Sequence, residues 1–175
     1  MIIDRKWAMP SKNTFSIKPI KEFINEEIKK GVIIDPFANI SKIANITNDI
    51  DPQYDTDYNL EALDFLKLFK TESVDTVLND PPYSVRQLSE VYKKVNLSVT
   101  METTSSKYWS NLRKEISRVV KPGGKVISCS WNSNGIGKRN GFKITRIRII
   151  AHGGIHNDTI IMSETKIQKR LNFNR

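Results

Sequence analysis

Short apolar runs alternate with segments of helical periodicity, and this alternation restricts the fold more than any other feature of the chain. The apolar runs cover residues 32–34, 43–47, 74–78 and 125–131, and the helical segments cover residues 20–31, 58–69, 84–95 and 105–120. Apolar runs this short are typical of strands buried in a parallel sheet. The pattern predicts an open α/β sheet, mainly parallel, with helices on both faces.

The two ends of the chain follow different patterns. Apolar residues alternate over 142–149 and again over 159–167, with the turn sequence HGGIHND between them, which predicts a C-terminal antiparallel hairpin. Residues 1–16 are polar, contain Pro10 and are expected to be irregular. The chain of 175 residues is expected to form a single domain, 1–175.

Charge and cysteine content limit the partners and the compartment. The net charge of +9 and the pI near 9.6 favour a polyanionic partner such as nucleic acid. An acidic protein or a membrane surface would also attract a positively charged chain. The single cysteine, Cys129, cannot form an intramolecular disulfide. Charges at Asp4, Arg5 and Lys6 do not suit a signal peptide, and no apolar run is long enough to span a membrane. We therefore expect a cytoplasmic protein without membrane contact.

Acidic residues follow the apolar runs. Asp35 ends the first run, Asp49 and Asp51 follow the second, and Asp80 follows the third. In open α/β sheets, ligands bind beyond the carboxyl ends of the strands. Acids there suit a ligand with hydroxyl or ammonium groups. The chain contains neither GxxxxGK[ST] nor GxGxxG, which argues against ATP and dinucleotides.

A double proline ends the third run. Residues 77–84 read VLNDPPYS, so that Asp80 precedes Pro81 and Pro82 and Tyr83 follows them. Proline has no N–H to donate to a sheet, so the strand has to stop there. The stretch predicts a stiff strand exit that carries an acid and an aromatic ring. A plain surface turn is the simpler alternative.

Taken in order, five stretches resemble the amino-methyltransferases that use S-adenosylmethionine: FSIKPIKEFI, IIDPFA, ITNDID, LEALDFL and VLNDPPYS. In that family a Lys-Pro helix start precedes the first strand, a DPF turn follows it, an acid ends the second strand, and DPPY ends the fourth. RVVKPGGKVIS resembles the next family strand, so the resemblance covers residues 15–131. DPFAN, SNGIGK and HGGIHNDTI are similar to stretches of small phage-type adenine-specific DNA methyltransferases.

The resemblance implies catalytic roles for the DPPY residues. Asp80 and the carbonyl of Pro81 accept hydrogen bonds from a nucleobase amine and direct its lone pair toward the methyl donor. Pro81 and Pro82 fix φ and hold that carbonyl in place. Tyr83 offers a face on which a flipped-out base stacks. The implied reaction is methylation of adenine N6 in DNA, with S-adenosylmethionine as the cofactor.

The same resemblance implies a donor site. Its expected members are Lys18, Pro19, Asp35, Pro36, Phe37, Asp49, Glu61, Ala62 and Phe65. Asp49 is placed like the acid that binds the ribose hydroxyls, with Asp51 as the weaker candidate, and Glu61 lies near the adenine. Helical spacing explains Phe65 equally well as a core residue. A plain helix start is the alternative for Lys18 and Pro19.

The turn after the first strand departs from the family pattern. The family has DPFxGxGT, whereas residues 35–41 read DPFANIS and lack both glycines. Asn39 tolerates left-handed backbone geometry and can replace one glycine, but the β-branched Ile40 resists that geometry. The departure implies a reshaped turn or weak donor binding. It also leaves open a binding module or regulatory partner that no longer catalyses the reaction.

Two further segments carry candidate contacts. The Gly- and Asn-rich stretch 131–142 holds Lys138 and Arg139, which we expect to contact nucleic acid; a solvated connection is the alternative. His152, His156 and Asp158 do not predict a metal site, because a glycine turn explains the segment equally well.

The sequence is compatible with DNA and with RNA as the substrate. No part of the chain resembles a separate target-recognition domain, so we expect short or relaxed sequence specificity, or recognition shared across a homodimer or with a partner chain. The DPPY motif also occurs in enzymes that methylate structured RNA, and cytosine N4 shares it with adenine N6. RNA is therefore the alternative substrate.

Overall fold

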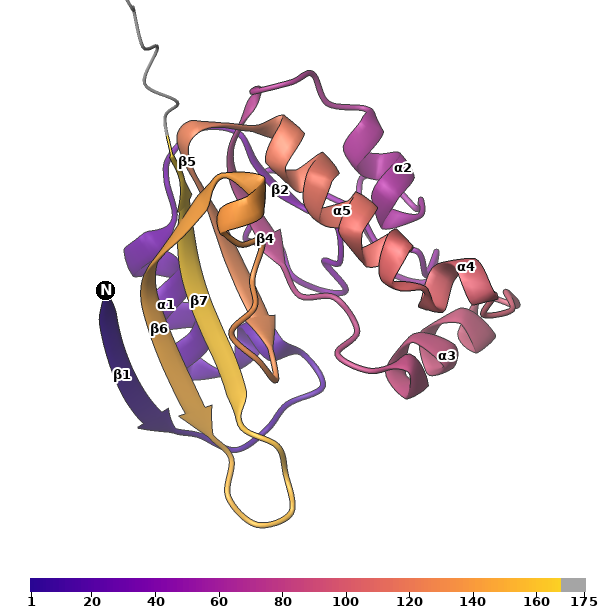
Figure 1. Cartoon of the computed structure of the whole chain (residues 1–175). Helices are drawn as coiled ribbons and strands as arrows, with labels where there is room; N and C mark the ends of the chain where they lie inside the picture. Colours follow the sequence, from indigo (N-terminus) through magenta and orange to yellow (C-terminus); the bar gives the residue numbers. More distant parts are fainter. Residues whose placement is uncertain (168–175) are drawn as a thin grey trace, which may run out of the picture.

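The computed structural model describes residues 1–167, which form one seven-stranded sheet in the order β1-β6-β7-β5-β4-β2-β3 (Figure 1). The strands are β1 (Ile2–Trp7), β2 (Ile33–Asp35), β3 (Ile46–Thr47), β4 (Val74–Asn79), β5 (Val120–Ser130), β6 (Phe142–Ala151) and β7 (Thr159–Lys166). The helices are α1 (Lys18–Glu27), α2 (Ala62–Lys67), α3 (Val85–Lys94), α4 (Met101–Thr104) and α5 (Ser106–Val119), with 3-10 turns η1 (Thr14–Ser16) and η2 (Lys138–Asn140).

The strand directions confirm the predicted sheet. The pairs β2·β3, β2·β4, β4·β5 and β1·β6 are parallel. Strand β7 is antiparallel to both β5 and β6, so β6 and β7 form the predicted C-terminal hairpin. The carboxyl ends of β2, β3, β4 and β5 therefore meet at one edge of the sheet, where a ligand is expected in this architecture.

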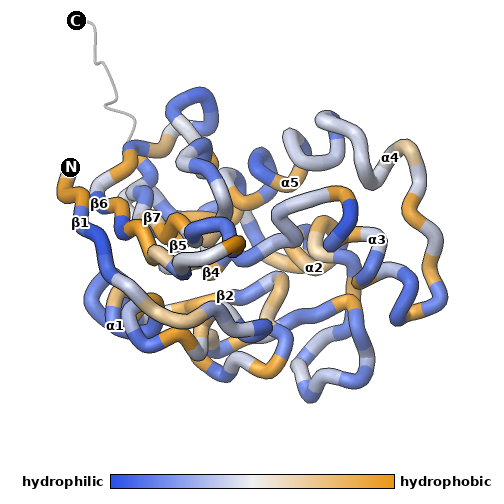
Figure 2. Tube along the Cα trace, turned by 90° about the horizontal axis from the view of Figure 1, so that it is seen from below, coloured by the Kyte–Doolittle hydropathy of each residue, from blue (hydrophilic) through white to orange (hydrophobic). Residues whose placement is uncertain are grey.

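Helices cover both faces of the sheet, as predicted. Figure 2 shows α1 on one side of the strands and α5 on the other, with the hydrophobic stretches gathered between them. Successive side chains of β4 point to opposite faces of the sheet and so pack against different helices. Val77 packs in a core with α2 and α5, and Leu78 packs in a second core with α1.

Local sequence explains where the main helices begin. Pro19 stands in the first turn of α1, where its missing N–H costs nothing, and Ile20, Phe23 and Ile24 follow on the buried face. Ser84 caps α3 by accepting a hydrogen bond from the Gln87 N–H at 3.2 Å. Ser-capped starts of this kind satisfy N–H groups that lack a partner within the helix.

The expectation that residues 1–16 are irregular was wrong. Ile2–Trp7 form strand β1, which pairs with β6 along its length, and Thr14–Ser16 form η1. Asp4 lies opposite Arg148 in this pairing and accepts hydrogen bonds from its Nε at 2.6 Å and Nη2 at 2.9 Å. The strand exists because of partners far away in the sequence, which no local pattern of residues 1–16 reveals.

Several predicted boundaries shift. Strand β5 begins at Val120, so the expected turn Pro122-Gly123-Gly124 lies inside the strand, next to a register shift against β4. Helix α2 is shorter than the predicted 58–69, and α4 lies in a connection for which no helix was predicted. None of the helices in residues 1–167 is long and apolar enough to cross a membrane.

Candidate active site

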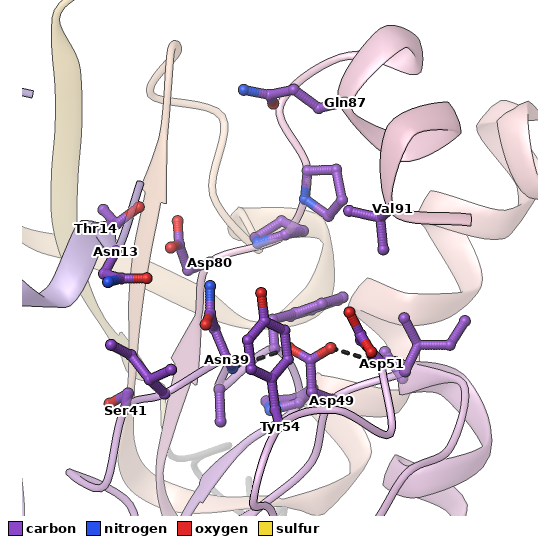
Figure 3. Close-up of a pocket in the computed structure, with 18 of the residues that line it drawn as sticks. Asn13, Thr14, Asn39, Ser41, Asp49, Asp51, Tyr54, Asp80, Gln87 and Val91 are labelled. Carbon is purple, nitrogen blue, oxygen red and sulfur yellow. Dashed lines mark hydrogen bonds between the residues drawn. The ribbon is translucent and has the colours of Figure 1, made fainter. Parts of the chain in front are cut away.

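A cavity of about 920 Å³ opens at the carboxyl edge of the sheet (Figure 3). Its walls come from the turn after β2, the segment after β3, the DPPY residues after β4, the N-terminal stretch around η1, and one side of α3. In Figure 3, Asp80 lies beside Asn13 and Thr14, whereas Asp49, Asp51 and Tyr54 lie together at the opposite wall. The cavity therefore joins segments that are distant in the sequence.

Nine of the predicted site residues line this cavity. They are Pro36, Phe37, Asp49, Glu61, Ala62, Asp80, Pro81, Pro82 and Tyr83. The catalytic and donor-binding groups expected from the sequence thus lie in one space. Asp35, the last residue of β2, is fully buried and does not line the cavity.

Asp80 is the acid at the exit of β4. Its Oδ1 accepts a hydrogen bond from the Tyr83 hydroxyl, and the Thr14 side chain also hydrogen-bonds to the carboxylate. Burial raises the pKa of Asp80 to about 6, against the lowering effect of these two hydrogen bonds. The backbone N–H of Tyr83 donates to Gln87 Oε1 at 2.6 Å, which ties the DPPY turn to α3.

Asp35 is a buried carboxyl group with spare hydrogen-bonding capacity. Its Oδ1 accepts from the Phe37 N–H at 3.0 Å, whereas Oδ2 has no partner among the described residues. Burial raises the pKa of Asp35 well above its ordinary value, and the nearby charges of Asp80 and Asp49 act in the same direction. The raised pKa favours the neutral carboxyl group, which can donate a hydrogen bond as well as accept one.

The turn after β2 contains a left-handed residue although it lacks both family glycines. Asn39 has φ of 52°, which is left-handed, so it takes the conformation expected of a glycine replacement. Its N–H donates to Asp49 Oδ2 at 2.9 Å. Ile40 points largely to solvent, with 58% of its surface exposed. The turn is therefore reshaped around Asn39, and Asp49 helps to hold it.

Asp49 and Asp51 form the acidic wall after β3. Asp49 Oδ1 accepts from the Asp51 N–H at 2.9 Å, and burial raises the pKa of Asp49. Asp51 is 5% exposed and accepts from the Gln53 N–H at 3.0 Å. Asn48, which the sequence did not single out, donates to the carbonyls of Pro36 and Leu60 and so joins the two donor-side segments.

Glu61 connects three helices at the cavity wall. It stands at the start of α2 and accepts hydrogen bonds from the hydroxyl of Tyr92 on α3 and, at 3.0 Å, from that of Tyr108 on α5. Burial raises the pKa of both tyrosines, so they remain hydroxyl donors. These tyrosines were missed, because only the folded chain brings them within reach of Glu61.

Other predicted site residues lie elsewhere. Lys18 and Pro19, both described, are absent from the cavity lining, which is formed instead by Asn13–Ser16 just upstream. Pro19 is buried, and its carbonyl accepts from Arg148 at 3.0 Å. Phe65 is fully buried and packs edge-on against Phe69 at 5.1 Å. The positions of Pro19 in the first turn of α1 and of Phe65 in the core agree with the simpler alternatives, and donor contacts of Lys18, Pro19 and Phe65 stay predictions.

Lys138 and Arg139 also lie away from the cavity. They lie in η2, directly before β6, and the neighbouring Asn140 carbonyl accepts from Ser117 near the end of α5 at 2.7 Å. Strand β7 is antiparallel to both β5 and β6, so β6 runs in the direction of β5, and η2 stands at the amino edge of the sheet, opposite the cavity. They cannot form an arm over the DPPY residues in this arrangement.

One of the two hairpin histidines has structural partners. His152 is 5% exposed, with Nδ1 2.8 Å from the Ala8 carbonyl and Nε2 2.9 Å from Thr159 Oγ1. Within residues 1–167, no group of three or more His, Cys, Asp or Glu side chains is placed to hold a metal ion.

No protein-family model matches the chain, and no curated protein matches it in sequence. Solved structures match it in fold. TrmN from Thermus thermophilus matches with a TM-score of 0.54 and 14% identity, over 86% of this chain and 49% of that chain. A SAM-dependent methyltransferase from Methanosarcina mazei matches with a TM-score of 0.54 and 13% identity, over 84% and 98%.

A third match contains a bound product of methyl transfer. It is the 1,6-didemethyltoxoflavin-N1-methyltransferase of Burkholderia thailandensis, solved with 1,6-didemethyltoxoflavin and S-adenosylhomocysteine, with a TM-score of 0.51 and 9% identity over 78% of this chain and 71% of that chain. The fold is that of S-adenosylmethionine-dependent methyltransferases. The chain spans about half the length of TrmN. These structural matches establish the methyltransferase fold, and the substrate is a question for the chemistry of the site.

Proposed function

We propose that this chain is an S-adenosylmethionine-dependent methyltransferase that modifies the N6 amine of adenine in DNA, as the small phage-type enzymes do. One observation carries the proposal: Asp80 of the DPPY segment and Asp49 after β3 line the same cavity at the carboxyl edge of a methyltransferase fold. A single domain acts, alone, as a homodimer or with a partner chain that adds target recognition.

The cavity fits the donor. Its volume of about 920 Å³ lies within the range of cofactor pockets, which is about 300–1,000 Å³. The Asp49 carboxylate already accepts two backbone N–H bonds and retains lone pairs for ribose hydroxyls. Phe37, which lines the cavity, is the expected contact of the methionine end, and the buried Asp35 supports the turn by accepting from the Phe37 N–H. Glu61, which lines the same cavity, is the proposed neighbour of the adenine.

S-adenosylmethionine supplies a methyl group on a positively charged sulfur. The acids Asp49, Asp51, Glu61 and Asp80 line the cavity and favour a cation there. Methyl transfer then depends mainly on position, because a well-oriented pair of reactants avoids much of the entropic cost of meeting. The chain's task is to hold the amine in line with that methyl group.

Asp80 orients the amine. With a pKa of about 6, its carboxyl group is mostly ionised at pH 7 and acts as an acceptor only. The amine N–H takes the position that the Tyr83 hydroxyl occupies on Oδ1. The Pro81 carbonyl provides the second acceptor. As the N–C bond forms and the C–S bond breaks, the amine loses one proton, which Asp80 is placed to accept.

Cations at the cavity provide contacts for phosphates. Lys12, Lys21 and Lys94 line the cavity, and none of them makes an ion pair with a residue of the described chain. Free lysines beside an acidic floor suit a polyanion that delivers a base into the cavity. These residues replace Lys138 and Arg139 as the proposed nucleic-acid contacts.

Mass spectrometry of nucleosides tests the proposal. The protein is incubated with the donor and, in separate reactions, with double-stranded DNA, single-stranded DNA and structured RNA, and each polymer is then digested. N6-methyladenine from DNA supports the proposal. Methylated RNA or N4-methylcytosine would change the substrate. Calorimetric titration with S-adenosylhomocysteine covers the remaining alternative, since a non-catalytic binding module without a donor site would give no heat of binding.

A further inference from the structure

A second cavity of about 330 Å³ lies behind the DPPY segment. It is bounded by α3, by α5 and by the loop that follows β5. Pro81, Pro82, Tyr83, Leu88 and Trp109 line both cavities, so only the double-proline turn and its neighbours separate them. Nothing in the donor site requires this second space.

The lining of the second cavity differs in chemistry from that of the first. Three aromatic side chains face it, Tyr83, Trp109 and Trp131, and the Tyr83 and Trp131 rings meet edge-on at 5.6 Å. Arg113 is the one charged side chain among the residues that line it, and no acid lines it. The main cavity, by contrast, carries acids suited to a cationic donor and an amine.

Two polar side chains of the second cavity, Asn79 and Arg113, keep hydrogen-bonding capacity for a ligand. Asn79 is 9% exposed; its Nδ2 donates to Ser128 Oγ at 3.2 Å, and its Oδ1 has no partner among the described residues. Arg113 makes no ion pair with a residue of the described chain. Aromatic walls, an amide and an arginine without acids suit a neutral planar heterocycle joined to a phosphate.

We propose that the second cavity binds the nucleobase next to the methylated adenine in the same DNA strand. This inference rests on the proposed function. Successive nucleotides of one strand are close enough to occupy two spaces that share the Pro81-Pro82 wall. Trp131 and Trp109 supply the stacking surface, and Arg113 contacts a base edge or the intervening phosphate.

This site gives the chain a sequence preference without a recognition domain. A pocket that hydrogen-bonds one base rejects another whose edge leaves its polar groups unpaired. The preference is therefore restricted to a position directly beside the target adenine. It depends on Arg113 and Asn79, and it is independent of Lys138 and Arg139 at the far edge of the sheet.

The first test measures methylation of short DNA oligonucleotides that carry one adenine, with each of the four bases or an abasic site at each neighbouring position. We expect one neighbouring position to change the single-turnover rate by about tenfold between best and worst base. Arg113→Gln should reduce that ratio to about twofold or less, whereas the control Lys138→Gln should keep it. Equal rates for all neighbours, or an unchanged ratio in Arg113→Gln, would overturn the inference.

The second test does not depend on activity. Fluorescent 2-aminopurine replaces the neighbouring base, and the oligonucleotide is bound in the presence of S-adenosylhomocysteine. Stacking against Trp131 quenches the fluorophore, so emission should be at least about twofold lower with the natural protein than with Trp131→Ala. Trp7→Phe, which changes an exposed tryptophan of β1, serves as the control. Quenching only when 2-aminopurine replaces the target adenine would mean that the cavity receives the target base instead.

The two proposals fail in different ways. Methyl transfer without neighbour preference or quenching removes the second-cavity inference and leaves the proposed function intact. Quenching that depends on Trp131 without methyl transfer to DNA removes the proposed reaction and leaves the base-binding site. Absence of both signals contradicts both.

Discussion

At the scale of single residues, Asp80 carries the chemistry, and its replacement separates transfer from binding. In Asp80→Asn, one carboxylate oxygen that accepts from the amine becomes an NH₂ group that donates hydrogen bonds. The acids that line the S-adenosylmethionine site are unchanged. We expect methyl transfer to fall about 100-fold or more, as when one catalytic hydrogen-bonding group is lost. Binding of S-adenosylhomocysteine, measured by calorimetry, should change less than about threefold. Asp64→Asn, on the exposed side of α2, is the control. Undiminished transfer in Asp80→Asn would remove this residue from the mechanism.

The pH dependence of transfer reports the same carboxyl group. Because the amine requires an ionised acceptor and the pKa of Asp80 is about 6, kcat/KM should fall about tenfold per pH unit below pH 6. The Tyr83 hydroxyl lowers that pKa by hydrogen bonding to the carboxylate. Tyr83→Phe should therefore move the acid limb of the profile to higher pH. A flat profile between pH 5 and 8, or a shift to lower pH in Tyr83→Phe, would contradict this assignment.

At the scale of elements, the turn after β2 depends on one left-handed residue. Asn39 has φ of 52°, which glycine adopts freely and β-branched residues resist. Asn39→Gly should unfold in urea with a free energy within about 0.5 kcal/mol of the natural protein, whereas Asn39→Val should lose about 1–2 kcal/mol. Asn39→Val should also weaken binding of S-adenosylhomocysteine, since the turn positions Phe37 and Asp49. Equal stability of the two variants would show that the backbone strain is absent.

An ion pair between two residues far apart in the sequence, Asp4 and Arg148, holds strand β1 in the sheet. Arg148 is 4% exposed and donates to Asp4 from two nitrogens. Asp4→Ala leaves this buried guanidinium without its main partner and should cost about 2–3 kcal/mol of unfolding free energy at pH 7. The pKa of Asp4 is lowered chiefly by Arg148, so the stabilisation is present above the unfolded value near 4 and disappears as pH falls through the folded value. A difference between the two proteins that is the same at pH 7 and below pH 3 would contradict the pairing.

At the scale of the whole molecule, the excess of positive charge predicts binding that depends on salt. Affinity for DNA should fall linearly on a double-logarithmic plot against salt concentration, as counterions are released from the phosphates. Three single variants, Lys12→Gln, Lys21→Gln and Lys94→Gln, should each reduce the magnitude of the slope of this plot by about one. The double variant Lys138→Gln/Arg139→Gln is the matched control, because its positions lie at the opposite sheet edge. An equal reduction from that control would move the interface away from the cavity.

Much of the molecule could be predicted from the sequence, and the failures share a physical cause. The strand exits at Asp35, Asp49 and Asp80 were predictable, because an apolar run that ends in an acid or a proline is a local signal. The Glu61–Tyr92–Tyr108 cluster was not, because helices distant in the chain bring its members together. Strand β1 was missed for the same reason. Phe65 shows the converse, since helical spacing places a ring equally well in a core or against a ligand.

The most direct measurement is a crystal structure of the chain with S-adenosylhomocysteine. We expect the ribose hydroxyls on Asp49 and the sulfur atom on the side of the cavity that faces Asp80 and the Pro81 carbonyl. An adenosine analogue that binds outside this cavity, or one whose sulfur is separated from Asp80 by the DPPY turn, would contradict the account.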